Sequence, residues 1–90
     1  MKSLDFADEF TLLNELKCRN FDAFSWLCKE YSEDLLILAY TILGDASLAN
    51  EKVEKLFIVL WGNNKLGNIT LPIHKYLSTE LQNLCRSKVI

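Results

Sequence analysis

The chain has 90 residues, which is room for one small domain whose core must use a large share of its apolar side chains. Half of the residues are hydrophobic and 24% are charged, a composition typical of an ordinary globular chain. The net charge of −2 excludes a basic field over the whole domain, so any contact with nucleic acid would have to come from a local patch.

The apolar runs are short. The longest, residues 35–43, falls well below the roughly 20 residues that a membrane span needs. The first residues contain no apolar core of a signal peptide, so we expect a cytoplasmic protein without a membrane partner. Cys18, Cys28 and Cys85 have no paired CxxC spacing, and together with His74 they match no zinc pattern. We therefore expect no metal and no other cofactor.

Helical periodicity begins near the N-terminus. A first short helix is expected over about residues 8–17, and Asn20 or Asp22 can cap a second, longer one. The apolar residues of the second helix are spaced by three and four, which predicts one continuous buried stripe. The stripe consists of Phe24, Leu27, Tyr31, Leu35, Leu38 and Ile42. A second apolar face predicts that the far half of this helix is buried on more than one side. Its members are Leu36, Tyr40 and Leu43.

A third helix follows a short turn. Gly44 supplies the left-handed backbone conformation that ends many helices, and Asp45 or Ser47 can cap the next one. We expect this helix to run to residues 61–62 along a stripe of apolar side chains. The stripe comprises Ala49, Val53, Leu56, Phe57 and Leu60. Residues 63–69 contain a glycine and three asparagines, which predicts a loop.

A fourth helix is expected after this loop. Thr70 can cap it, and Pro72 fits its first turn, where a missing N–H costs nothing. Its inner side is expected to consist of Ile73, Leu77, Leu81, Leu84 and Lys88. No stretch alternates with period two, so the sequence predicts an all-α fold, a compact bundle of about four helices in a single domain over residues 1–90. The side chains expected in its core include Phe24, Leu35, Phe57 and Leu77.

Groups that could carry catalysis are scarce. The single histidine, His74, lies in the first turn of the fourth predicted helix, and no Gly-rich phosphate loop, HExxH or GxSxG motif occurs. The carboxylate clusters fall on predicted outer faces of helices, where a solvated surface is the simpler explanation. The sequence therefore predicts a protein that is not an enzyme.

Four stretches, in order, resemble region 2 of the sigma-70 superfamily, in its extracytoplasmic-function (ECF) group. They are residues 20–31, residues 35–45 (LLILAYTILGD), residues 49–61 (ANEKVEKLFIVLW) and the spaced set Tyr76, Leu77, Asn83 and Arg86. The third stretch is similar to the family pattern AeDivQevFlrlW. The resemblance covers about residues 10–88. The family's second DNA-binding domain, a helix-turn-helix known as region 4, has no counterpart in these 90 residues.

The resemblance implies a non-catalytic domain that acts in transcription initiation. The third helix would dock on the clamp helices of the RNA polymerase β′ subunit, through Asn50, Glu51, Glu54 and Lys55. The loop and the fourth helix would bind the melted, single-stranded non-template strand of the minus-ten promoter DNA. The residues implied for DNA are Trp61, Asn63, Asn64, Lys65, Asn68, Lys75, Tyr76, Asn83, Arg86 and Lys88. Aromatic rings and amides hold unpaired bases, while Lys and Arg neutralise phosphates.

The composition of the C-terminal third agrees with a DNA contact, because Glu80 is its only acid after Lys55. Two departures from the family pattern point the other way. Glu54 puts a charge where the family has a neutral glutamine that contacts the polymerase, and Glu80 puts an acid on the predicted DNA-binding helix. Trp61 closes the apolar stripe of the third helix, which favours a place in the core or at its edge over a platform for base stacking. The alternative interpretations are a sigma-like protein-interaction module without DNA binding, for instance a decoy for an anti-sigma factor, and an unrelated helical bundle.

Overall fold

The computed structural model describes residues 5–62 and 65–86, and these residues form four α-helices and one short 3-10 helix. The helices are α1 (Glu9–Lys17), α2 (Phe21–Leu43), α3 (Ala46–Gly62) and α4 (Ile73–Arg86), with the 3-10 helix η1 (Lys65–Asn68) between α3 and α4. No strand occurs in the described ranges. The expected all-α bundle is therefore confirmed.

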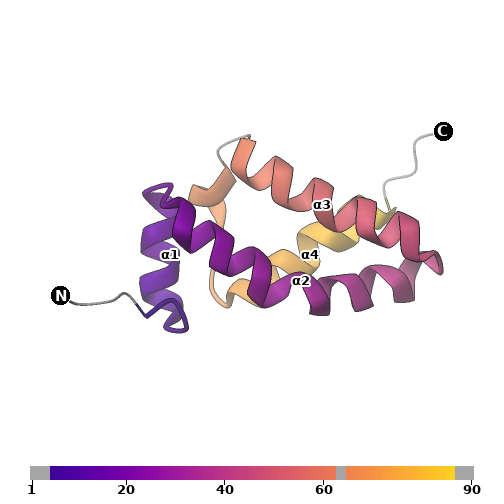
Figure 1. The fold of residues 1–90 in the computed structure, drawn as a ribbon, viewed down its shortest axis with the longest axis horizontal. Coiled ribbons are helices and arrows are strands. Elements are labelled where there is room, and N and C mark those ends of the chain that lie inside the picture. The colour runs from indigo at the N-terminus through magenta and orange to yellow at the C-terminus, as the bar shows by residue number, and fades with distance from the viewer. Residues whose placement is uncertain (1–4, 63–64, 87–90) are drawn as a thin grey trace.

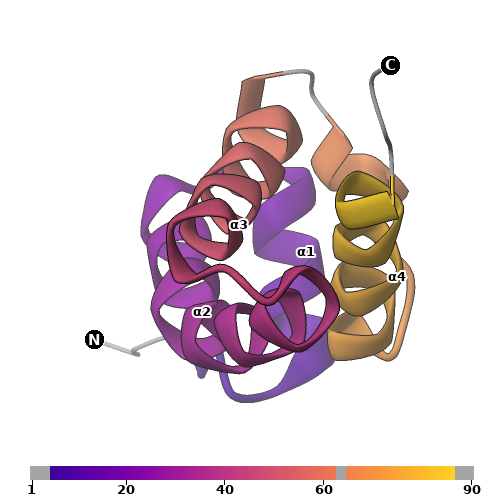
Figure 2. The same cartoon turned by 90° about the vertical axis from the view of Figure 1, so that its right-hand side faces the viewer.

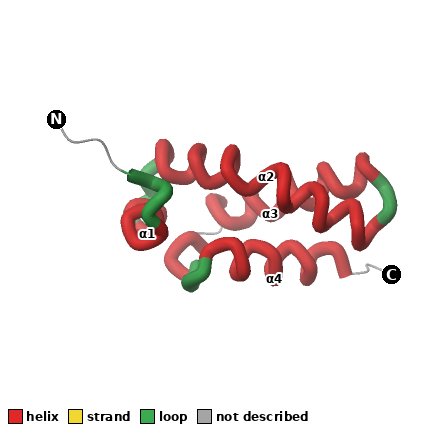
Figure 3. Tube along the Cα trace, turned by 90° about the horizontal axis from the view of Figure 1, so that it is seen from below, coloured by secondary structure: helices red, strands yellow, loops and turns green. Residues whose placement is uncertain are grey.

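The two longest helices, α2 and α3, form an antiparallel hairpin, and α4 packs against both of them. The short helix α1 lies across one end of this bundle, where it contacts α2 and η1 (Figure 1). Seen from below, α4 runs alongside the hairpin, and α1 is seen nearly end-on (Figure 3). The molecule is elongated, with extents of 49 × 22 × 19 Å.

Local capping determines where three of the helices begin. The Asp8 carboxylate accepts a hydrogen bond from the Thr11 N–H (3.2 Å) at the start of α1, and the Asp45 carboxylate accepts one from the Leu48 N–H (3.1 Å) at the start of α3. Of the two candidates for α2, the cap is Asn20, whose side-chain oxygen accepts from the Asp22 N–H at 2.9 Å. Helix α2 ends at Gly44 in the left-handed conformation, with φ at 70°.

The start of α4 differs from the prediction. The helix begins at Ile73, three residues after the expected cap at Thr70, and Pro72 stands just before it with its carbonyl accepting from the Lys75 and Tyr76 N–H groups. The Ile73 N–H instead donates to the Glu9 carboxylate, 2.8 Å away. A side chain of α1 therefore caps α4. Because the two residues are 64 positions apart, nothing in the sequence next to α4 indicates this cap.

The core runs the length of the α2–α3–α4 bundle and continues under α1 and η1. Of the four side chains expected in it, Phe24, Leu35 and Leu77 are buried, whereas Phe57 is only half-buried. In α4 the buried positions follow a spacing of four and end at Cys85, while Leu84 is half-buried and Lys88 lies outside the described residues.

Two expectations about burial were wrong. The stretch predicted as a plain loop contains η1, and its Leu66 and Ile69 are buried in the core. The far half of α2 is not buried on two sides: Tyr40 and Ile42 are 53% and 38% exposed. The reason is that α4 covers one side of the hairpin and leaves the other open, as the end-on view shows (Figure 2).

Candidate functional site

The outer face of α4 gathers polar side chains without a carboxylate. The buried residues of this helix, Ile73, Leu77, Leu81 and Cys85, follow one another at intervals of four. An α-helix has 3.6 residues per turn, so the residues on its opposite side include Lys75, Thr79, Asn83 and Arg86, and all four are exposed. Lys75 and Arg86 are eleven residues apart, about three turns, and therefore lie nearly in line. This face has two cations and two neutral hydrogen-bonding groups.

The single acid of α4 lies to one side of this face. Glu80 is half-buried, and it follows Tyr76, also half-buried, by one helical turn. Burial raises the pKa of the Tyr76 hydroxyl, and the nearby Glu80 carboxylate raises it further. The hydroxyl therefore stays protonated at neutral pH and can donate a hydrogen bond.

A pocket of about 360 Å³ opens beside the first turns of α4. It is lined by Thr70, Leu71, Pro72, Lys75, Tyr76 and Thr79. Apolar and hydroxyl groups meet here next to the Lys75 ammonium, so the first turns of α4 offer both a surface for a flat ring and a counter-charge. Two residues predicted for DNA, Lys75 and Tyr76, are thus brought together.

Trp61 occupies a different environment from the one a free stacking platform would need. Its ring centroid lies 4.9 Å from that of Phe24 and 5.6 Å from that of Phe21. The guanidinium carbon of Arg19 lies 4.3 Å from the Trp61 ring centroid, and an Arg19 N–H donates to the Trp61 carbonyl at 2.9 Å. Trp61 therefore belongs to an aromatic cluster at the edge of the core, which favours its structural interpretation.

Sequence reasoning missed Arg19 and Phe21, which complete this cluster. Arg19 lies in the turn between α1 and α2, with a positive φ of 57°, and reaches a helix end 42 residues away. Phe21, at the start of α2, is 62% exposed. No local pattern pairs this turn with the end of α3.

The remaining residues predicted for DNA are only partly described. Asn68 is exposed at the end of η1. Asn63, Asn64 and Lys88 lie outside the described residues, as does the side chain of Lys65.

The four residues predicted to face the polymerase are all exposed on α3. They are Asn50, Glu51, Glu54 and Lys55. Ile58, which lies one turn beyond Glu54, is 68% exposed, and it lines a hollow of about 400 Å³ together with three of them, Glu51, Glu54 and Lys55. This row thus combines one large exposed apolar side chain with charged groups around it.

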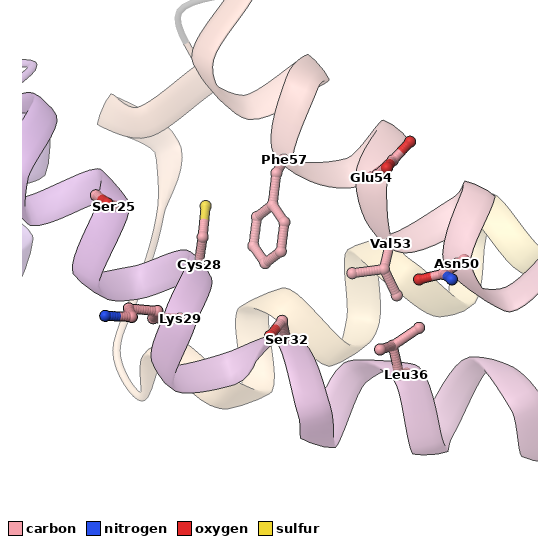
Figure 4. A pocket seen from close by; sticks show the side chains of 9 residues that line it. All are labelled: Ser25, Cys28, Lys29, Ser32, Leu36, Asn50, Val53, Glu54 and Phe57. Carbon is pink, nitrogen blue, oxygen red and sulfur yellow. The ribbon is translucent and has the colours of Figure 1, made fainter.

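A second, larger groove separates α2 from α3 on the side away from α4. Its volume is about 550 Å³, and Phe57, Val53 and Leu36 point into it, while Glu54 points away from α2 (Figure 4). Cys28 lies beside Phe57, and burial raises the pKa of its thiol to about 11, so the thiol is protonated and unreactive at neutral pH. The groove has an apolar floor and a polar rim.

No metal site accompanies these surfaces in the described part of the chain, where no three His, Cys, Asp or Glu side chains group closely enough to hold an ion. Nor do residues 5–62 and 65–86 include a helix long and apolar enough to cross a membrane.

Comparison with protein-family models, curated proteins and solved structures found no match to this chain.

Proposed function

We propose that this chain is a sigma-factor region 2-like domain of the ECF type. It binds the single-stranded minus-ten strand of promoter DNA with α4 and the clamp helices of the polymerase β′ subunit with α3. The observation that carries the proposal is the outer face of α4, where Lys75, Asn83 and Arg86 share one exposed side. Cations there can neutralise phosphates, and the amide can bind a base edge.

The exposed row on α3 supports the polymerase half of the proposal. Glu51 and Lys55 flank the exposed Ile58, so an apolar contact can be oriented by charge pairs at its rim. Because α2 and α4 both pack on the other sides of α3, this row is presented on a rigid support.

DNA binding is tested by its dependence on salt. We expect the chain to bind a labelled single-stranded minus-ten oligonucleotide, measured by fluorescence anisotropy. Each phosphate contact adds about −0.7 to the slope of log K against log salt for single strands. Replacing Lys75 and Arg86 together by Gln should therefore make the slope less negative by about 1.4. The matched control replaces two exposed cations of other helices, Lys17 and Lys29, by Gln.

An equal change in slope for the control pair would show that the contact is not on α4. Absence of binding at every salt concentration would favour the second candidate, a sigma-like module that binds only proteins. That candidate is favoured by one specific observation: Trp61 is held by Phe24, Phe21 and Arg19 within the domain itself.

Polymerase binding is tested with the isolated β′ clamp coiled coil. We expect the chain to bind it, and the Glu54→Gln variant to bind more tightly, because Gln removes an exposed charge and restores the amide of the sigma pattern. Isothermal titration calorimetry measures both affinities. If neither protein binds the coiled coil, the polymerase half of the proposal is wrong.

A further inference from the structure

The charges of the α2–α3 hairpin are distributed unevenly. Residues 30–51, which span the second half of α2, the turn and the first turns of α3, contain five acids and no Lys or Arg. We call this segment the acidic tip. Its acids are Glu30, Glu33, Asp34, Asp45 and Glu51, and all five are exposed. The turn of the tip lies at the end of the molecule opposite α1 (Figure 1).

The tip also exposes large apolar side chains. Ile37 and Tyr40 on α2 are 62% and 53% exposed. They border a mainly apolar groove of about 340 Å³ between α2 and α3, whose other lining residues are Leu36, Thr41, Ala46, Ala49 and Asn50. The small side chains of Ala46 and Ala49 leave the groove open. Apolar groups exposed together in this way mark a binding surface.

The groove at the tip continues toward the middle of the hairpin. Leu36 and Asn50 line both this groove and the larger one shown in Figure 4, so the two form one depression along α2 and α3. A long depression between two antiparallel helices has the shape that receives a third helix, as the opposite side of the same hairpin receives α4.

We propose that the acidic tip is the docking site for an amphipathic helix of another protein, with a stripe of Leu, Ile or Phe side chains flanked by Lys and Arg. The apolar stripe covers Ile37 and Tyr40, and the cations pair with carboxylates that the same segment exposes. This inference goes beyond the proposed function: it shares Asn50 and Glu51 with the row on α3, whereas Ile37 and Tyr40 belong to this surface alone.

The charge of the tip selects this partner over others. A second copy of the chain would bring five more carboxylates against the first five, and like charges placed together across an interface oppose association. The phosphates of nucleic acid are repelled for the same reason. Within the domain, burial raises the pKa of Tyr31, and the carboxylates of Glu9 on α1 and of Glu30 and Asp34 in the tip raise it further.

The probe for this site is a dye-labelled synthetic peptide of about 18 residues, five helical turns, in which Leu occupies one helical face and Lys the remainder. Two further peptides serve as comparisons. One has the same composition in an order that forms no apolar stripe, and the other has Glu in place of every Lys. We expect the striped Lys peptide to bind the full chain at least about tenfold more tightly than the reordered peptide, and the Glu peptide not to bind.

Variants place the binding on the tip. Ile37→Ala and Tyr40→Ala should each lower the affinity for the striped peptide by about fivefold or more, the loss typical of a residue central to an interface. Both side chains are exposed, so neither change disturbs the core. The matched control is Phe10→Ala on α1, a side chain that is 68% exposed at the other end of the molecule.

Three results would overturn the proposal: equal affinity for the striped and reordered peptides, an equal loss of affinity in the Phe10→Ala variant, or no binding of the striped peptide. Self-association in sedimentation experiments that Ile37→Asp abolishes would also overturn it, in favour of a second copy at the tip. The DNA measurement above does not involve the tip. The row on α3 shares Asn50 and Glu51 with the tip, but Ile37 and Tyr40 lie outside that row, so their variants let this inference and the proposed function fail separately.

Discussion

Arg19 has a left-handed backbone conformation (φ 57°) that residues with a side chain usually avoid, at a cost of about 1–2 kcal/mol. The side chain offsets this cost through two contacts with Trp61: the guanidinium lies over the indole ring, and an N–H donates to the backbone carbonyl. That carbonyl is among the last of α3, whose negative end a cation stabilises. One residue thus fastens the turn after α1 to the end of α3.

Two substitutions at Arg19 should separate the stabilisation by its side-chain contacts from the cost of its backbone conformation. Arg19→Ala removes both contacts and keeps the strained backbone, so we expect it to lower the free energy of unfolding by about 1–2 kcal/mol. Arg19→Gly also removes the contacts, but glycine adopts positive φ freely, so we expect it to be more stable than the Ala variant. Urea unfolding followed by tryptophan fluorescence measures both. A Gly variant less stable than the Ala variant would contradict this account.

For single residues, contacts with neighbours in the sequence could be predicted, whereas contacts with distant segments could not. Asn20 caps α2 through N–H groups two and three residues away, and Gly44 ends it by its own backbone, so both could be read from neighbouring residues. The partners of Trp61 come from the turn before α2 and from its first turn. Helical periodicity carries no information about which of two apolar stripes a tryptophan will join.

Among the elements, η1 differs most from expectation. Glycine and asparagine in residues 63–69 predicted a loop, yet Leu66 and Ile69 are 1% and 3% exposed. Two apolar residues three positions apart can both point inward from a single 3-10 turn, because that helix has three residues per turn. The turn closes the end of the core between α1 and α3.

The Leu66→Ala variant should measure what η1 contributes. Truncating a fully buried leucine usually costs about 2–5 kcal/mol, and we expect a loss in this range in the free energy of unfolding. The control is Leu71→Ala, a few residues further on, where the side chain is 38% exposed and the loss should stay below about 1 kcal/mol. Equal losses in chemical denaturation would mean that residues 65–69 act as an ordinary surface loop.

The far half of α2 shows the opposite error. Apolar residues on two faces predicted burial on two sides. An apolar pattern also arises where an exposed face of a helix binds another protein. Sequence alone cannot distinguish the two cases, because the hydrophobic pattern of a core and that of an interface are the same. The exposure of Ile37 and Tyr40 shows that they lie outside the core, and the proposed docking of a partner helix would account for their apolar character.

For the whole molecule, the fold class and the four helices could be predicted because both rest on periodicity and on local capping. The arrangement of the candidate surfaces could not. The polar face of α4 depends on which of its sides meets α2 and α3, and Glu80 looked like an acid within the DNA-binding helix until its place on the flank was known. Charge is thus divided by position, with acids at the hairpin tip and cations along α4.

The hydrogen bond from the Ile73 N–H to the Glu9 carboxylate has a consequence for biosynthesis. A ribosome makes α1 first, but this helix finds its cap partner and its neighbour η1 only after residues 65–73 have been translated and released. The α2–α3 hairpin can form earlier, because its contacts join segments close in the chain. Helix α1 can contact α2 early, but it meets η1 and α4 only when the rest of the domain has emerged, so the completion of its docking is expected among the last steps of folding in the cell.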